Sequence, residues 1–152
     1  MMAKAEAAAV PARARSGGAE ITLGVGGPEE LRELARLSEA EFGFLPDRSS
    51  EEYYRWQYYD NPAGRAIVAS AWSLGELVGH YAVVPVRVVV EGRETTAGIG
   101  VNAIIKKEFQ GRAIFARLVV SAEQAATRNG IDFHYVVPSP ESHPWFVRLL
   151  RY

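Results

Sequence analysis

The stretch from residue 66 to residue 105 constrains the fold more than any other part of this sequence. It is rich in β-branched and aromatic residues and is interrupted at Ser73-Leu74-Gly75, at Pro85 and at Glu91-Gly92-Arg93. Such residues are typical of strands, and such interruptions are typical of turns. We therefore predict several antiparallel strands in succession, at residues 66–72, 77–84, 86–90 and 95–105.

Helical patterns flank this stretch on both sides. We predict a helix from Pro28 to Gly43, a second helix that begins with a Ser cap at Ser49 or Ser50 and stops at Asp60-Asn61-Pro62, and a third, strongly amphipathic helix at 111–128. Shorter elements complete the chain: strands at 21–25 and 131–137, and a helix at 145–150. This order predicts a mixed α/β (α+β) fold with a mainly antiparallel sheet flanked by helices, and not a repeated βαβ ladder.

Composition excludes several classes of function. The chain has 152 residues, of which 48% are hydrophobic, and this suits one domain with a single sizeable core. Seventeen Lys and Arg against eighteen Asp and Glu leave a net charge of −1, which gives no global argument for nucleic acid or an anionic membrane surface. The absence of cysteine excludes a thiol nucleophile and a disulfide framework. No apolar run approaches the roughly 20 residues that span a bilayer.

The first residues differ in composition from the rest. Residues 1–19 are rich in Ala, carry a few basic residues, and include Ser16-Gly17-Gly18. A targeting presequence has some of these features, but Glu6, Pro11 and the lack of an apolar region favour a disordered tail. We therefore predict a tail at 1–19 and a single domain at 20–152 of a cytoplasmic protein that binds neither nucleic acid nor membranes.

Residues 104–115 carry the most information about function. A strand that ends at Ile104 and Ile105 leads through a short polar loop into a helix whose first turn contains Gly111 and Ala113. The free N–H groups of a first helical turn favour an anion, and small residues let a phosphate approach the backbone. Arg112 adds positive charge. This arrangement suits a pyrophosphate-bearing ligand, although a plain strand-to-helix connection with a solvated basic edge explains the pattern as well.

The segment EFQGRAIFARLV resembles motif A of the GCN5-related N-acetyltransferases, the GNAT family, whose pattern is Gln/Arg-x-x-Gly-x-Gly/Ala. Gly111 and Ala113 match this pattern, whereas Glu108 stands where the family has Gln or Arg, and Lys107 replaces a common Pro. The order of elements from residue 21 to residue 152 also follows the family. The resemblance implies a GNAT-like fold in which the last two strands of the family are missing from this chain.

The resemblance also implies a ligand and a reaction. The ligand would be acetyl-CoA or another acyl-CoA, and the acyl group would pass directly to a small-molecule or peptide amine without a metal ion. The strand at Ile104 and Ile105 would pair with the pantetheine arm, and the next strand, at 131–137, would diverge to open the slot. The backbone around the following helix start would hold the pyrophosphate, through Gln110, Gly111, Arg112, Ala113, Ile114 and Phe115.

Direct transfer requires a neutral amine, so a base or a water relay must remove a proton. Many relatives use a Glu on the strand before motif A, where this chain offers Asn102 as the polar side chain. His134 is the best remaining titratable candidate, with an ordinary sheet histidine as the alternative, and His80 carries the same interpretation with less positional support. The Tyr that often serves as the acid in the last helix corresponds to Val147. The aromatic residues at 53–59 wall a substrate pocket or simply pack on the sheet.

Other functions remain open at this point. The end at Tyr152 favours a catalytically impaired CoA-binding module, or a fragment of a longer acetyltransferase, whose open sheet edge can form a homo-oligomer. The run from Gly98 to Ala103 fits the G-x-G-x-x-A dinucleotide fingerprint, but it lies within a strand and opens no helix. The three histidines lack metal-ligand spacing, so we expect no metal site.

Overall fold

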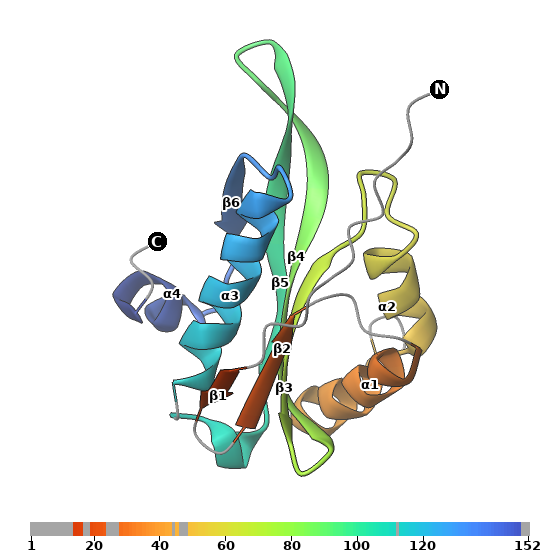
Figure 1. Cartoon of the computed structure of the whole chain (residues 1–152), viewed down its shortest axis with the longest axis vertical. Helices are drawn as coiled ribbons and strands as arrows, with labels where there is room; N and C mark the ends of the chain where they lie inside the picture. The colour runs from red at the N-terminus through yellow and green to blue at the C-terminus, as the bar shows by residue number, and fades with distance from the viewer. Residues whose placement is uncertain are drawn as a thin grey trace.

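The computed structural model describes residues 14–16, 19–23, 28–43, 45, 49–111 and 113–149. Within these residues, six strands form one sheet in their order along the chain, with helices against both faces (Figure 1). The elements are β1 (Ala14–Ser16), β2 (Ala19–Leu23), α1 (Pro28–Phe42), α2 (Glu51–Tyr58), β3 (Ile67–Ser73), β4 (Glu76–Val90), β5 (Arg93–Ile105), the 3-10 turn η1 (Lys107–Phe109), α3 (Ile114–Arg128), β6 (Phe133–Val136) and α4 (His143–Leu149).

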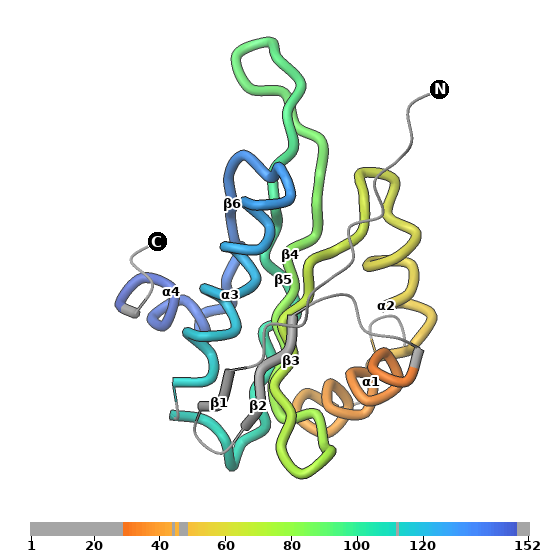
Figure 2. Tube along the Cα trace, in the orientation of Figure 1, coloured from red at the N-terminus to blue at the C-terminus, as the bar shows by residue number. Residues whose placement is uncertain are grey.

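The sheet is mixed and mainly antiparallel. Strands β1 to β5 pair antiparallel with their neighbours, and β6 alone runs parallel to β5. Helices α1 and α2 lie on one side of the sheet and α3 on the other, as the trace in Figure 2 makes clear. The predicted fold class is therefore confirmed.

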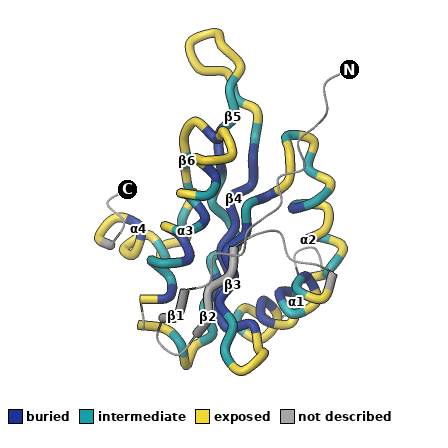
Figure 3. The backbone as a smooth tube through the Cα atoms, viewed as in Figure 1, coloured by how far each residue is buried: buried dark blue, intermediate teal, exposed yellow. Residues whose placement is uncertain are grey.

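Two cores fill the space on the two faces of the sheet. On the α3 face, Ile114, Leu118 and Ala122 of α3 pack against alternate residues of β3 and β4. On the opposite face, Leu34 of α1 and Tyr54 of α2 pack against the other set of strand residues. Figure 3 shows these buried segments in the centre of the molecule and an exposed tip on the β4–β5 hairpin. The core-facing alternation of β3 and β4 is what fixes which side chains point toward each helix layer.

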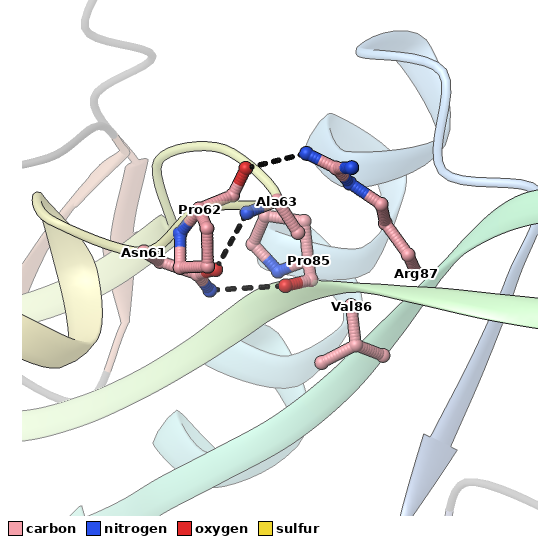
Figure 4. Close-up of a pocket in the computed structure, with 6 residues that line it drawn as sticks. All are labelled: Asn61, Pro62, Ala63, Pro85, Val86 and Arg87. Atoms are coloured by element: carbon pink, nitrogen blue, oxygen red, sulfur yellow. Dashed lines mark hydrogen bonds between the residues drawn. The ribbon is translucent and has the colours of Figure 1, made fainter.

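Strand β4 corrects one prediction, because it continues through Pro85 where two separate strands were expected. The neighbouring strand β3 runs antiparallel to β4, and its first residue, Ile67, pairs with Val83. Strand β3 therefore does not extend as far as Pro85. A proline therefore breaks no ladder bond on that side. The Asn61 side chain lies there and donates to the Pro85 carbonyl at 3.0 Å, at the edge of a small cavity of about 360 Å³ (Figure 4).

The helices begin where local backbone chemistry dictates. Of the two predicted cap residues, Ser49 and Ser50, it is Ser50 whose side chain caps α2, by accepting a hydrogen bond from the Tyr53 N–H at 3.1 Å. Helix α3 begins at Ile114, later than the predicted residue 111, because Gly111 and Ala113 adopt left-handed φ angles of 75° and 58°. Residues 107–109 form the unpredicted η1 instead.

The ends of the chain are described only in part. Strand β2 ends at Leu23, whereas the predicted strand continued to Val25, which lies outside the described residues. Strand β1 falls inside the segment 1–19 for which we predict a disordered tail. Residues 1–13 and 150–152 lie outside the described part, so the tail, the domain boundary and the missing strands stay predictions.

Candidate functional site

A cleft of about 990 Å³ opens where β5 and β6 part. The two strands pair only between residues 97–100 of β5 and 133–136 of β6, and β5 then continues alone to Ile105. From Val101 to Ile105, the edge of β5 on the β6 side is therefore unpaired by β6 and borders the cleft. Strand β6 ends at Val136, where the pairing ends, and this leaves a strand edge of β5 able to accept an extended ligand.

Seven of the eight residues expected to bind the cofactor line this cleft. They are Ile104, Ile105, Gln110, Gly111, Ala113, Ile114 and Phe115. The eighth, Arg112, lies outside the described residues. These residues could be singled out because a strand end, a glycine and a helix start are all local features of the sequence, and their role in cofactor binding stays a prediction.

The start of α3 has the backbone of an anion site. The Arg117 N–H donates to the Ala113 carbonyl at 3.2 Å, so the N–H groups of Ile114 and Phe115 belong to the first turn, which has no preceding helical carbonyl to bond. Ala113 occupies the N-cap without a side-chain hydrogen bond. The helix dipole and these donors together favour a negatively charged group beside residues 113–115.

The neighbouring cation Lys106 is already paired. Its ammonium lies 2.7 Å from Glu76 and 3.5 Å from Glu108, and the hydrogen bond to Glu76 raises the pKa of Lys106 above its usual value. Its charge is thus largely neutralised within the protein. We therefore assign the anion-binding capacity of this corner to the helix start rather than to Lys106.

Asn102 reaches the other side of the cleft through a β-bulge. His80 pairs with Ile104 and Ala82 pairs with Val101, so Asn102 and Ala103 together oppose a single residue of β4. Asn102 adopts a left-handed φ of 53°, and its side chain turns toward α2. There its Nδ2 donates to Gln57 Oε1 and to the Tyr58 hydroxyl, both at 2.7 Å.

From Asn102 a series of hydrogen bonds, the Asn102 network, runs through the buried core to Glu30 of α1. The Tyr58 hydroxyl accepts from Asn102 and lies 2.9 Å from Nε2 of His80. The other ring nitrogen of His80, Nδ1, lies 3.4 Å from the Ser70 hydroxyl, which in turn donates to Glu30. Tyr58, Ser70 and His80 are each at most 1% exposed.

In the Asn102 network, one assignment of hydrogen-bond donors and acceptors gives every group a partner. Tyr58 accepts from Asn102, so we direct the hydroxyl hydrogen of Tyr58 to Nε2 of His80. The ring hydrogen is then assigned to Nδ1, on the side of the Ser70 hydroxyl. Burial lowers the pKa of His80 to about 3, which keeps the ring neutral as this arrangement requires. These hydrogen bonds therefore hold Asn102 with its Nδ2 facing inward, and no described residue hydrogen-bonds to its Oδ1.

The two candidate catalytic residues from the sequence are not brought together. Asn102 lines the cleft, whereas His134 is absent from its lining and packs on the α3 face in the paired part of β6. A Cβ atom on Gly98 would come within 2.9 Å of the His134 ring, and Nε2 is buried without a hydrogen-bond partner among the described residues. Burial lowers the pKa of His134. A catalytic role for His134 stays a prediction without support from this position.

Sequence reasoning missed a second polar pair at the cleft, Tyr81 and Glu123. Tyr81 of β4 lines the cleft from the α3 face, and its hydroxyl donates to Glu123 of α3 at 3.4 Å. Burial raises the pKa of Glu123 to about 7, and it raises the pKa of Tyr81 above its usual value. Glu123 directly follows Ala122 of the buried face of α3, but no sequence pattern links it to a tyrosine 42 residues earlier.

No cluster of three His, Cys, Asp or Glu side chains within the described ranges is arranged to hold a metal ion. No helix among the residues described is long and apolar enough to cross a membrane.

Comparison with known proteins gives a consistent result. The family model described as the acetyltransferase (GNAT) domain matches residues 26–146. No curated protein sequence matches the chain significantly.

Among solved structures, a predicted acetyltransferase from Clostridium acetobutylicum with acetyl-CoA has a TM-score of 0.69 at 13% identity, over 85% of this chain and 88% of the other. An acetyltransferase from Trypanosoma brucei has a TM-score of 0.64 at 16% identity, over 85% and 90%. An aminoglycoside acetyltransferase from an uncultured soil metagenomic sample, in complex with sisomicin, has a TM-score of 0.61 at 16% identity, over 86% and 85%. At these identities the likeness concerns the fold.

Proposed function

Because the chain belongs to the GNAT acetyltransferase family, we propose that it transfers an acetyl group from acetyl-CoA to a primary amine by direct attack. The single observation that carries this proposal is the continuous cleft from the start of α3, along the free edge of β5, to Asn102. One end suits a pyrophosphate, the middle suits an amide-bearing arm, and the far end offers a polar group for an amine.

The dimensions of the donor agree with this placement. About thirteen covalent bonds separate the terminal phosphorus of CoA from its sulfur, which is comparable to roughly four residues of extended chain at three backbone bonds each. An arm that begins beside Ile105 and lies along β5 thus brings the thioester to Val101 and Asn102. The solved relative from Clostridium acetobutylicum contains acetyl-CoA, which supports this donor.

In the proposed reaction the amine nitrogen attacks the thioester carbon, the C–N bond forms, and the C–S bond breaks. Asn102 Oδ1 accepts a hydrogen bond from the amine and orients its lone pair toward the carbonyl. A water relay removes the amine proton, because the one imidazole that connects to Asn102, His80, is buried and kept neutral. The lack of cysteine agrees with transfer in one step, with both substrates bound together.

The acetyl donor is tested by changing the charge at the start of α3 without disturbing the helix. Asp and Asn are both favourable N-cap residues and both tolerate a left-handed φ, so Ala113→Asp and Ala113→Asn should fold equally well. We expect Ala113→Asp to weaken CoA binding at least tenfold in titration calorimetry, because its carboxylate repels the pyrophosphate. Ala113→Asn is the neutral control. Equal CoA affinity in the two variants would remove the pyrophosphate site.

Turnover is tested separately from binding. Thiol release from acetyl-CoA is measured against polyamines, amino sugars, aminoglycosides and peptides. Incubation with labelled acetyl-CoA alone should leave no stoichiometric covalent label on the protein. Binding without release for any amine would support the alternative of a CoA-binding module, and tight NADH binding would revive the dinucleotide alternative.

A further inference from the structure

The hydroxyl of Tyr81 lies at the point where β5 and β6 separate. Tyr81 is 1% exposed and its ring belongs to the core on the α3 face, but the residue also lines the cleft. A Cβ atom on Gly100 would come within 2.0 Å of the Tyr81 hydroxyl oxygen, so the hydroxyl occupies the space that a side chain at position 100 would fill. Gly100 and Val136 form the last pair between the two strands.

This position coincides with the reach of the acyl donor, and here the inference rests on the proposed function. An extended arm of roughly four residues' length, laid along β5 from Ile105, ends at Val101, the residue next to Gly100. The sulfur would then lie beside the Tyr81 hydroxyl on the α3 face. Asn102 faces the opposite side of the sheet, toward α2. The cleft therefore offers a hydroxyl to the leaving sulfur and an amide oxygen to the incoming amine, from opposite faces.

We propose that the Tyr81 hydroxyl is the acid that protonates the CoA sulfur during transfer, with Glu123 as its proton supply. When the C–S bond breaks, its electron pair goes to sulfur, and sulfur takes the hydrogen of the Tyr81 hydroxyl. The Tyr81 oxygen takes the carboxyl hydrogen of Glu123, which lies 3.4 Å away on α3. The half-buried Glu123 then regains a proton from solvent. No oxidant or further reactant is needed.

The electrostatic environment supports both roles. Burial raises the pKa of Tyr81, so the phenol stays protonated until a strong acceptor such as a thiolate forms. Burial raises the pKa of Glu123 to about 7, so a large fraction of Glu123 carries a proton at neutral pH. A protonated Glu123 donates to the Tyr81 oxygen and leaves the phenolic hydrogen free for sulfur.

The decisive test compares CoA with desulfo-CoA, in which hydrogen replaces the thiol. Wild-type protein should bind CoA about 2- to 10-fold more tightly than desulfo-CoA in calorimetry, because one hydrogen bond to sulfur distinguishes the two. Tyr81→Phe should bind both equally and keep the affinity for desulfo-CoA. Tyr59→Phe on α2, at a residue absent from the cleft lining, serves as the matched control.

A variant of Glu123 separates proton supply from sulfur recognition. In Glu123→Gln the amide donates permanently to the Tyr81 oxygen, so the preference for CoA should remain while kcat falls by roughly 10²-fold or more with any accepted amine. A Tyr81→Phe protein that keeps the preference for CoA would overturn the proposal while leaving the proposed function intact. A wild-type protein that binds neither compound would overturn both.

Discussion

The clearest energetic prediction concerns the hydroxyl of Tyr58, which joins Asn102 to His80 in the Asn102 network. Tyr58→Phe keeps the ring and creates no cavity, but it deprives His80 Nε2 of its donor at 2.9 Å. Asn102 retains its bond to Gln57. The perturbation thus leaves one buried acceptor unsatisfied in a residue that is 1% exposed.

The expected cost follows from that count. One unsatisfied buried polar group destabilises a protein by about 1–3 kcal/mol, and we take about 2 kcal/mol. For a chain of this size this corresponds to a fall in Tm of about 4–8 °C. The control is Tyr59→Phe, the next residue along, whose half-buried ring lies under the Arg65 guanidinium at 5.7 Å. Its effect should stay within about 0.5 kcal/mol.

The assay is urea denaturation followed by circular dichroism, repeated in a His80→Leu background. If the hydroxyl acts through His80, Tyr58→Phe should destabilise the His80→Leu protein much less than the wild type, and the coupling energy should exceed about 1 kcal/mol. Nitrogen NMR of the wild type should show a neutral ring with its hydrogen on Nδ1. A Tyr58→Phe protein as stable as Tyr59→Phe, or a hydrogen found on Nε2, would refute the donor assignment in the Asn102 network.

Two further predictions concern the cleft. Ala113→Gly should raise stability by about 0.5–1 kcal/mol in the same denaturation assay, because glycine accepts the φ of 58° without the strain that alanine incurs; an unchanged or lower stability would contradict the left-handed cap. The pKa of Glu123 is about 7 when folded, above its usual 4.5, so its contribution to stability is full below pH 4.5 and is lost as the pH rises through about 7. Glu123→Gln lacks this loss and should therefore gain stability relative to the wild type between pH 4.5 and 7, measured as the difference in Tm; a constant difference would rule out the raised pKa.

The sequence predicted the parts of this molecule that depend on neighbouring residues. The order of elements, the cap at Ser50 and the cleft corner at Gly111 and Ala113 all follow from local patterns. The continuity of β4 through Pro85 does not follow from a local pattern, because it depends on how far along β4 the pairing with β3 extends. A proline interrupts a strand only where the N–H that it lacks would have donated a hydrogen bond to a neighbouring strand.

The polar contacts of the site could not be predicted from the sequence for a related reason. Strict alternation along β5 would place Asn102 on the α3 face, opposite Val101, and the bulge instead puts both on the α1–α2 face. One extra residue in the register thus decides whether Asn102 meets Tyr58. Tyr81 and Glu123 meet only after β4 and α3 pack, and His134 could be placed on the α3 face only once its pairing with Gly98 was known.

The sheet itself separates the two halves of the proposed reaction, and this makes them independently testable. The Asn102 network lies on the α1–α2 face, and the Tyr81–Glu123 pair lies on the α3 face, with β5 between them. The two systems share no hydrogen-bonded residue, so their effects should add. Tyr58→Phe should raise KM for the amine and leave the preference for CoA over desulfo-CoA unchanged, whereas Tyr81→Phe should abolish that preference and leave KM for the amine unchanged. A double variant whose kcat/KM departs from the product of the single effects would show that the faces are coupled, and the assignment of one face to the amine and the other to the sulfur would fail.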